Sequence, residues 1–101
     1  MRLMVMFDLP VETSAERRAY RKFRKGLIKE GFFMMQYSIY VRVCPNRKSA
    51  RFLEDRVSRL APERGLIQTM MVTEAQYQAM NFIVGSSSDD IRNSAERTIV
   101  I

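Results

Sequence analysis

Five consecutive apolar residues near the start of the chain, Leu3 to Phe7, constrain the fold more than any other stretch. A strand with one face in solvent alternates apolar and polar residues, whereas this run is apolar at both parities. It therefore predicts a strand that is buried on both faces, at the centre of a sheet. Because the chain has 101 residues, which is one domain's worth of sequence, we expect all of its elements to share one core.

Two segments have the spacing of amphipathic helices. The first is expected to begin near Ser14, because Thr13 and Glu16 are spaced as in a capping box. The second is expected between the Pro45–Asn46 break and Pro62. The apolar positions expected to face the core are Ala19, Tyr20, Phe23 and Leu27 in the first helix and Ala50, Leu53, Val57 and Leu60 in the second.

Alternating apolar residues predict the other strands. Phe32–Val43 is interpreted as one long strand, with the parity that contains Phe33, Met35 and Val41 on the core. Further strands are expected at 66–73 and 80–84, separated by a short helical or turn segment at 74–79. We assign the order βαββαβ, a ferredoxin-like α+β sandwich in which two helices cover one face of a four-stranded antiparallel sheet.

The end of the chain and the bare sheet face both indicate a homodimer. Residues 1–84 are expected to form the ferredoxin-like domain, and residues 85–101 a flexible linker followed by a C-terminal strand. That strand would pair with a sheet edge, most simply in the partner of a two-fold homodimer. The bare face is expected to expose Phe32, Met34 and Tyr40, which packing of one sheet on another would bury.

The charge and the rare residue types narrow the classes of function. Seventeen Lys and Arg against eleven Asp and Glu give a net charge of +6, which favours polyanions and nucleic acid first. One Cys and no His argue against an internal disulfide, the usual zinc sites and a Ser-His-Asp triad. No apolar run approaches the roughly 18 residues that cross a bilayer, and no signal peptide is evident, so we expect a cytoplasmic protein without a membrane partner.

The first predicted helix carries most of the excess positive charge. Seven Lys and Arg lie from Arg17 to Lys29, with Glu16 and Glu30 at the ends. A solvated face and an anion-binding face both remain open at this point, although like charges four residues apart weaken a helix. Without exposed aromatic residues nearby, such a face favours the backbone of a duplex over single strands. The residues assigned to nucleic-acid binding are Arg17, Arg18, Arg21, Lys22, Lys25 and Lys29.

Asp8 is the acidic residue at the end of the apolar strand. An acid there is costly to bury without a partner, and two copies of Asp8 in a dimer would suit a shared Mg²⁺ ion. Alternatively, Asp8 only caps the turn at Leu9–Pro10 or pairs with an arginine. One carboxylate per chain predicts weak metal binding and slow hydrolysis.

Motifs along nearly the whole chain resemble the CRISPR-associated protein two family, the small CRISPR adaptation protein, in the form that accompanies type II systems. Their order and spacing carry the resemblance more than any one of them. The matching stretches are 4–10 (MVMFDLP), 16–25 (ERRAYRKFRK), 30–32 (EGF), 36–40 (QYSIY), 72–74 (VTE) and 93–97 (NSAER). The resemblance implies a ferredoxin-like homodimer whose two-fold axis brings the two Asp8 residues together, with the C-terminal strand completing the partner's sheet.

The resemblance implies two roles of different classes. One is a Mg²⁺-dependent endonuclease on RNA or double-stranded DNA, in which Asp8 matches the catalytic and metal-binding aspartate. The other is a scaffold for spacer acquisition that bridges dimers of the CRISPR integrase and holds duplex DNA. We expect the scaffold role to be the physiological one, with the nuclease activity dispensable. The alternative is a stand-alone, toxin-like ribonuclease of the same fold, which needs no integrase.

Overall fold

β1 (Arg2–Asp8) is the apolar run near the start of the chain, and it lies inside the sheet as predicted. It pairs antiparallel with β3 (Ile39–Val43) on one side and with β4 (Leu66–Val72) on the other. β2 (Phe33–Gln36) pairs with β3, so the strand order is β2-β3-β1-β4. This computed structural model describes residues 1–85.

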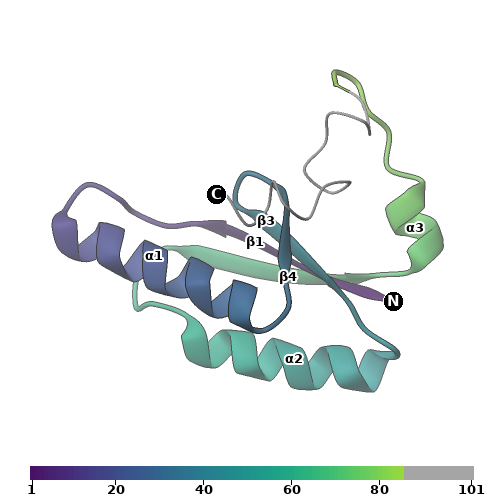
Figure 1. The fold of residues 1–101 in the computed structure, drawn as a ribbon, viewed down its shortest axis with the longest axis horizontal. Coiled ribbons are helices and arrows are strands. Elements are labelled where there is room, and N and C mark those ends of the chain that lie inside the picture. The colour runs from purple at the N-terminus through teal and green to yellow at the C-terminus, as the bar shows by residue number, and fades with distance from the viewer. Residues whose placement is uncertain (86–101) are drawn as a thin grey trace.

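The helices lie on both sides of this sheet. α1 (Ser14–Lys29) and α2 (Arg47–Leu60) cover one face, and the short α3 (Glu74–Gln78) lies on the other (Figure 1). The chain order is therefore βαββαβ followed by α3, which confirms the ferredoxin-like α+β class. The predicted capping box also forms, because the Thr13 hydroxyl accepts from the Glu16 N–H at 3.1 Å and the Glu16 carboxylate accepts from the Thr13 N–H at 2.9 Å.

The long strand predicted over residues 32–43 is wrong, because this stretch is a hairpin of β2 and β3. Its turn contains Ser38, whose φ is 63°, and a bulge interrupts the pairing between Met34 and Gln36. The turn lacks the Asn-Gly or Gly-containing pair that usually marks a hairpin, so the apolar alternation continues through it. Because the hairpin contains two strands, it supplies the fourth strand of the sheet. The strand predicted at 80–84 does not form.

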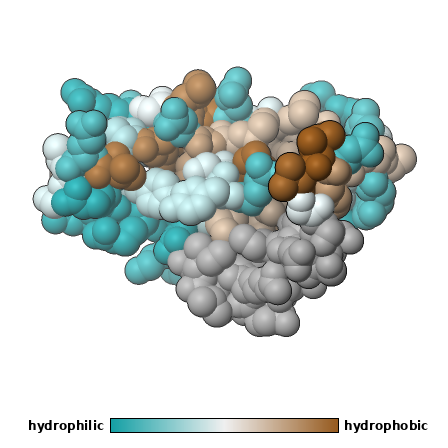
Figure 2. Space-filling view, turned by 90° about the horizontal axis from the view of Figure 1, so that it is seen from above, coloured by the Kyte–Doolittle hydropathy of each residue, from teal (hydrophilic) through white to brown (hydrophobic). Residues whose placement is uncertain are grey.

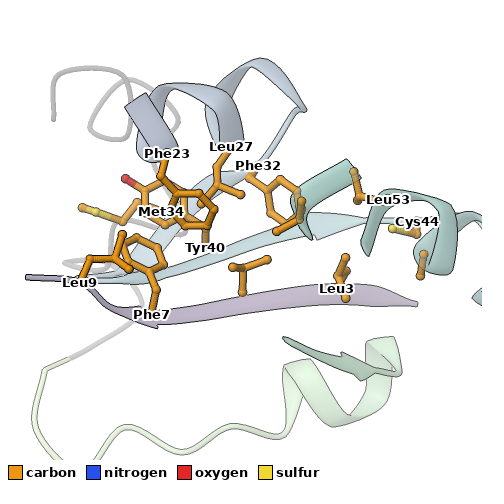
Figure 3. Close-up of a cluster of buried hydrophobic side chains, with 13 residues drawn as sticks. Leu3, Phe7, Leu9, Phe23, Leu27, Phe32, Met34, Tyr40, Cys44 and Leu53 are labelled. Atoms are coloured by element: carbon orange, nitrogen blue, oxygen red, sulfur yellow. The ribbon is translucent and has the colours of Figure 1, made fainter. Parts of the chain in front are cut away.

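The predicted core parity of this stretch is also reversed. Phe32, Met34 and Tyr40 are buried beneath the helices instead of lying on the bare face (Figure 3). Both parities are apolar here, so alternation alone does not identify the core face. The register decides it: Tyr40 lies opposite Val5 of β1, on the helix-covered face. Phe7 packs there edge-on against Phe23, with ring centroids 5.1 Å apart.

The face opposite α1 and α2 is apolar, and among residues 1–85 it is covered only in part, by α3. Met4, Val41 and Tyr77 form a second buried cluster on it. Leu66 and Met70 on the same face are 57% and 50% exposed. Figure 2 views this side, where tan and brown apolar residues interrupt a hydrophilic surface.

The linker and C-terminal strand predicted for residues 85–101 lie outside the described residues, except for Gly85. Within residues 1–85, no helix is long and apolar enough to cross a membrane.

Candidate functional site

Asp8 is the last residue of β1, and its side chain is exposed. The assumption from the sequence that Asp8 is buried, and therefore needs a partner, does not apply. Asp8 lies opposite Leu66 of β4. Within residues 1–85 its carboxylate accepts no hydrogen bond and forms no ion pair, so neither the capping alternative nor the arginine pair is observed there. Both oxygens are therefore available to a ligand.

Two residues in the left-handed region of φ hold the backbone around Asp8. On one side, the carbonyl of Ser38, with φ 63°, accepts a hydrogen bond from the N–H of Phe7 at 3.0 Å. On the other side, Gly65 has a φ of 106°, and a Cβ there would lie 2.9 Å from the Asp8 carbonyl oxygen and 2.6 Å from Leu9 Cδ2. Only glycine allows that approach, so the strand end is fixed by its neighbours.

An open depression of about 380 Å³ lies beside Asp8, between the start of α1 and the β2–β3 turn. Arg17 borders it but is already engaged, because its Nη1 donates to the carbonyls of Val11 at 3.1 Å and Glu12 at 2.8 Å. Arg21 is exposed and forms no ion pair within the described part of the chain. The lining residues are Asp8, Leu9, Val11, Arg17, Tyr20, Arg21, Tyr37 and Ser38.

Tyr37 is the site residue that the sequence does not indicate. Its parity predicts a strand residue that faces the core, but it lies in the β2–β3 turn and is 77% exposed. A turn signal in the sequence would have placed it at the surface, and none is present. Burial, together with the neighbouring Tyr37 hydroxyl, raises the pKa of Tyr20, so the Tyr20 phenol stays protonated beside the depression.

The outward face of α1 is continuously cationic. All six residues assigned to nucleic-acid binding are exposed, and none forms an ion pair with an acidic residue among residues 1–85. The helix buries its opposite side through Phe23, Gly26 and Leu27, which leaves the cations to solvent. In α2, by contrast, Arg56 pairs with Glu30 at 2.9 Å and is less available for an anion.

The donors at the site suit a hard cation but do not complete a metal centre in one chain. Asp8 supplies carboxylate oxygen, the ligand type that Mg²⁺ prefers. In the described portion of the chain, no group of three or more His, Cys, Asp or Glu side chains lies close enough together to hold a metal. An ion here would therefore need further oxygen ligands from water, phosphate or a second protomer.

These features define a small ferredoxin-like α+β domain that carries a cationic helix face next to an exposed carboxylate at the end of the central strand. The crystal structure of Streptococcus pyogenes Cas2 at pH 6.5 has the same fold. Its TM-score is 0.62 at 16% sequence identity, over 83% of this chain and 100% of that one.

Sequence comparison identifies the family. The family model for CRISPR associated protein Cas2 matches residues 1–80. A protein of Lacticaseibacillus rhamnosus named CRISPR-associated endoribonuclease Cas2 is 61% identical over 101 residues, which cover 100% of both chains. A protein of the same name from Streptococcus mutans is 39% identical over 100% of this chain and 93% of its own. The chain therefore belongs to the CRISPR-associated Cas2 family.

Proposed function

We propose that this chain acts in CRISPR spacer acquisition, where it bridges dimers of the CRISPR integrase and binds the duplex DNA of the new spacer. The outward face of α1 is the observation that supports this most. Its exposed cations have no acidic partner within residues 1–85, and the helix turns its aromatic residues, Tyr20 and Phe23, toward the core. Cations without base-reading groups suit the phosphate backbone of a duplex, independent of its sequence.

The sheet face that α3 covers only in part, among residues 1–85, supports the homodimer on which the bridging role depends. Leu66 and Met70 are half exposed on it, and Val43 is 54% exposed. A second copy that packs its own sheet against this face would remove these side chains from water. Because α1 lies on the opposite side of the sheet, such a dimer leaves the cationic face of each protomer free for DNA.

We also propose a family-type, metal-dependent endonuclease activity on RNA or double-stranded DNA, centred on Asp8. The relatives named endoribonuclease support a nuclease. Asp8 would hold Mg²⁺ through a carboxylate oxygen, shared with the Asp8 of the second protomer, and Arg21 would bind a phosphate oxygen. A bound Mg²⁺ ion would supply an acidic water and positive charge for phosphodiester hydrolysis. With one carboxylate per chain, we expect weak metal affinity and slow cleavage.

The test of the duplex-binding role is a charge reversal of Arg18, Lys22 and Lys25 to Glu. We expect duplex affinity to fall, because the phosphates lose their partners. The slope of log affinity against log salt should shrink by roughly 0.9 for each lost phosphate contact. Titration of a labelled blunt duplex at several salt concentrations measures both quantities.

The matched control keeps the charge at the same positions, with Arg18→Lys, Lys22→Arg and Lys25→Arg. These changes should leave affinity and slope close to those of the unmodified protein. If the Glu variant, folded by circular dichroism, binds the duplex with unchanged affinity and slope, α1 is not the DNA-binding surface.

A further inference from the structure

Tyr37 is an exposed aromatic side chain on a turn whose backbone is tethered to β1. Of the aromatic side chains in residues 1–85 it is the most exposed, at 77%, although burial of a phenol ring is strongly favourable. Its position is set by the adjacent Ser38, whose left-handed backbone is tied to β1 through the Phe7 N–H. An exposed ring on a tethered turn needs little reordering to bind a planar ligand.

The surroundings of Tyr37 point to a nucleotide. The ring borders the depression of about 380 Å³ that also contains Asp8 and Arg21, a volume within the range of small-molecule sites. Arg21 is an exposed cation without an ion pair in the described residues, whereas Arg17 is held by two loop carbonyls. Asp8 repels an anion placed directly above it, so a phosphate would lie on the arginine side.

We infer that the depression beside Asp8 binds one unpaired nucleotide, whose base stacks on Tyr37 and whose phosphate lies beside Arg21. This inference rests on the proposed function and adds to it a preference for an unpaired nucleotide at the depression. Bases within a duplex are covered by their neighbours, so only an unstacked base can use an aromatic side chain in this way. The chain therefore has a duplex site on α1 and a single-strand site at the depression, and Arg21 lies where the two meet.

The absence of tryptophan from the sequence allows a direct test, because Tyr37→Trp introduces a single indole reporter. Its fluorescence is followed while a short single-stranded oligonucleotide is added in EDTA, where metal-dependent cleavage cannot occur. We expect quenching by this oligonucleotide, and little or none by an abasic oligonucleotide of the same length or by a blunt duplex. Phe52→Trp is the matched control, since Phe52 is 58% exposed on α2 and does not line the depression.

A second pair of variants tests the same contact by affinity. Tyr37→Ala should weaken binding of the single strand at least about fivefold, because one base loses its stacking partner, while Tyr37→Phe should bind as tightly as the unmodified protein. Both variants should retain duplex affinity, which depends on α1.

Equal quenching by the abasic or duplex ligand would overturn the inference, as would unchanged single-strand affinity in folded Tyr37→Ala. Either result leaves the duplex test of α1 untouched. Loss of duplex binding on charge reversal of α1, together with no response at Tyr37, would keep the proposed scaffold function and remove only the single-strand site.

Discussion

The carboxylate of Asp8 owes its position to close backbone contacts with two residues outside β1. Ser38 holds the β1 end through the Phe7 N–H, and Gly65 lies against the Asp8 and Leu9 backbone on the other side. Both have positive φ, a conformation that glycine adopts freely but that a serine keeps only where its surroundings impose it. The geometry of the site is therefore sensitive to substitutions that leave Asp8 itself unchanged.

Gly65→Ala should destabilise the fold by about 1–3 kcal/mol, because the added Cβ meets the Asp8 carbonyl oxygen and φ stays positive. It should also slow metal-dependent cleavage by displacing Asp8, without changing duplex affinity. Urea unfolding and a cleavage assay measure the two effects. Gly85→Ala is the matched control, since Gly85 also has positive φ but a Cβ added there would meet nothing within 4 Å. Equal effects of the two substitutions would contradict a role for the close approach at Gly65.

The sequence alone indicated Asp8 and the cations of α1 as candidate site residues, but it did not indicate Tyr37 or Gly65. Asp8 and the cations of α1 stand out because a charge at the end of an apolar strand, or a row of one sign, is visible without a fold. The exposure of Tyr37 is not visible in that way, because it depends on a turn between two apolar strands that no Gly or Asn marks. The support from Gly65 depends on contacts across the sheet.

At the scale of elements, α3 is held on the open sheet face by Arg2 of β1. Arg2 Nε donates to Glu74 Oε1 at 2.8 Å, and Arg2 Nη2 donates to Glu74 Oε2 at 2.9 Å. The Arg2 Cζ also lies 3.8 Å from the centre of the Tyr77 ring. The hydrogen bond from Arg2, and a weaker contribution from Gln78, lower the pKa of Glu74 from its ordinary value of 4.5 to about 2.

This pKa predicts how the attachment of α3 depends on pH. Because the folded pKa lies below the ordinary one, the contribution of Glu74 is full above about pH 5 and is lost as the pH falls through 4.5 toward 2. Glu74→Gln should therefore speed amide exchange in α3 at pH 6, and the difference from the unmodified protein should shrink near pH 2. Hydrogen exchange at the Tyr77 N–H, which donates to the Thr73 carbonyl at 3.0 Å, reports it.

Glu63→Gln, at an exposed loop glutamate, is the control and should leave α3 unchanged. Equal exchange in Glu74→Gln and the unmodified protein at pH 6 would show that the ion pair does not hold α3.

The elements that the sequence predicts well are those set by local rules. The start of α1 follows from Thr13 and Glu16, and the ends of α2 from Asn46 and Pro62, all within a few residues of the boundary. The β2–β3 hairpin and the core parity of its strands follow from pairing with β1, and Arg2 and Glu74 meet across 72 residues of sequence. Long-range pairing of this kind leaves no periodic signal in the chain.

At the scale of the whole molecule, the two kinds of surface lie on opposite sides of the sheet. The cations assigned to nucleic-acid binding belong to α1 in the helix layer. Leu66, Met70 and Val43 are half exposed on the other sheet face, which among residues 1–85 is covered only in part, by α3. A protein that dimerises through one side keeps the other for a polyanion. The proposed bridging role needs this separation, because the scaffold must bind DNA and a second copy at the same time.

In the proposed dimer, Asp8 serves cleavage while α1 serves duplex binding. The most direct measurement of this division compares metal-dependent cleavage of labelled RNA and duplex DNA by the unmodified protein and by Asp8→Ala. Light scattering and duplex titration are carried out on both. We predict that Asp8→Ala loses cleavage and keeps the dimer mass and the duplex affinity. Cleavage that persists in Asp8→Ala, or a loss of its dimer or duplex binding, would contradict this division. Absence of cleavage by both proteins would remove the nuclease and leave the scaffold.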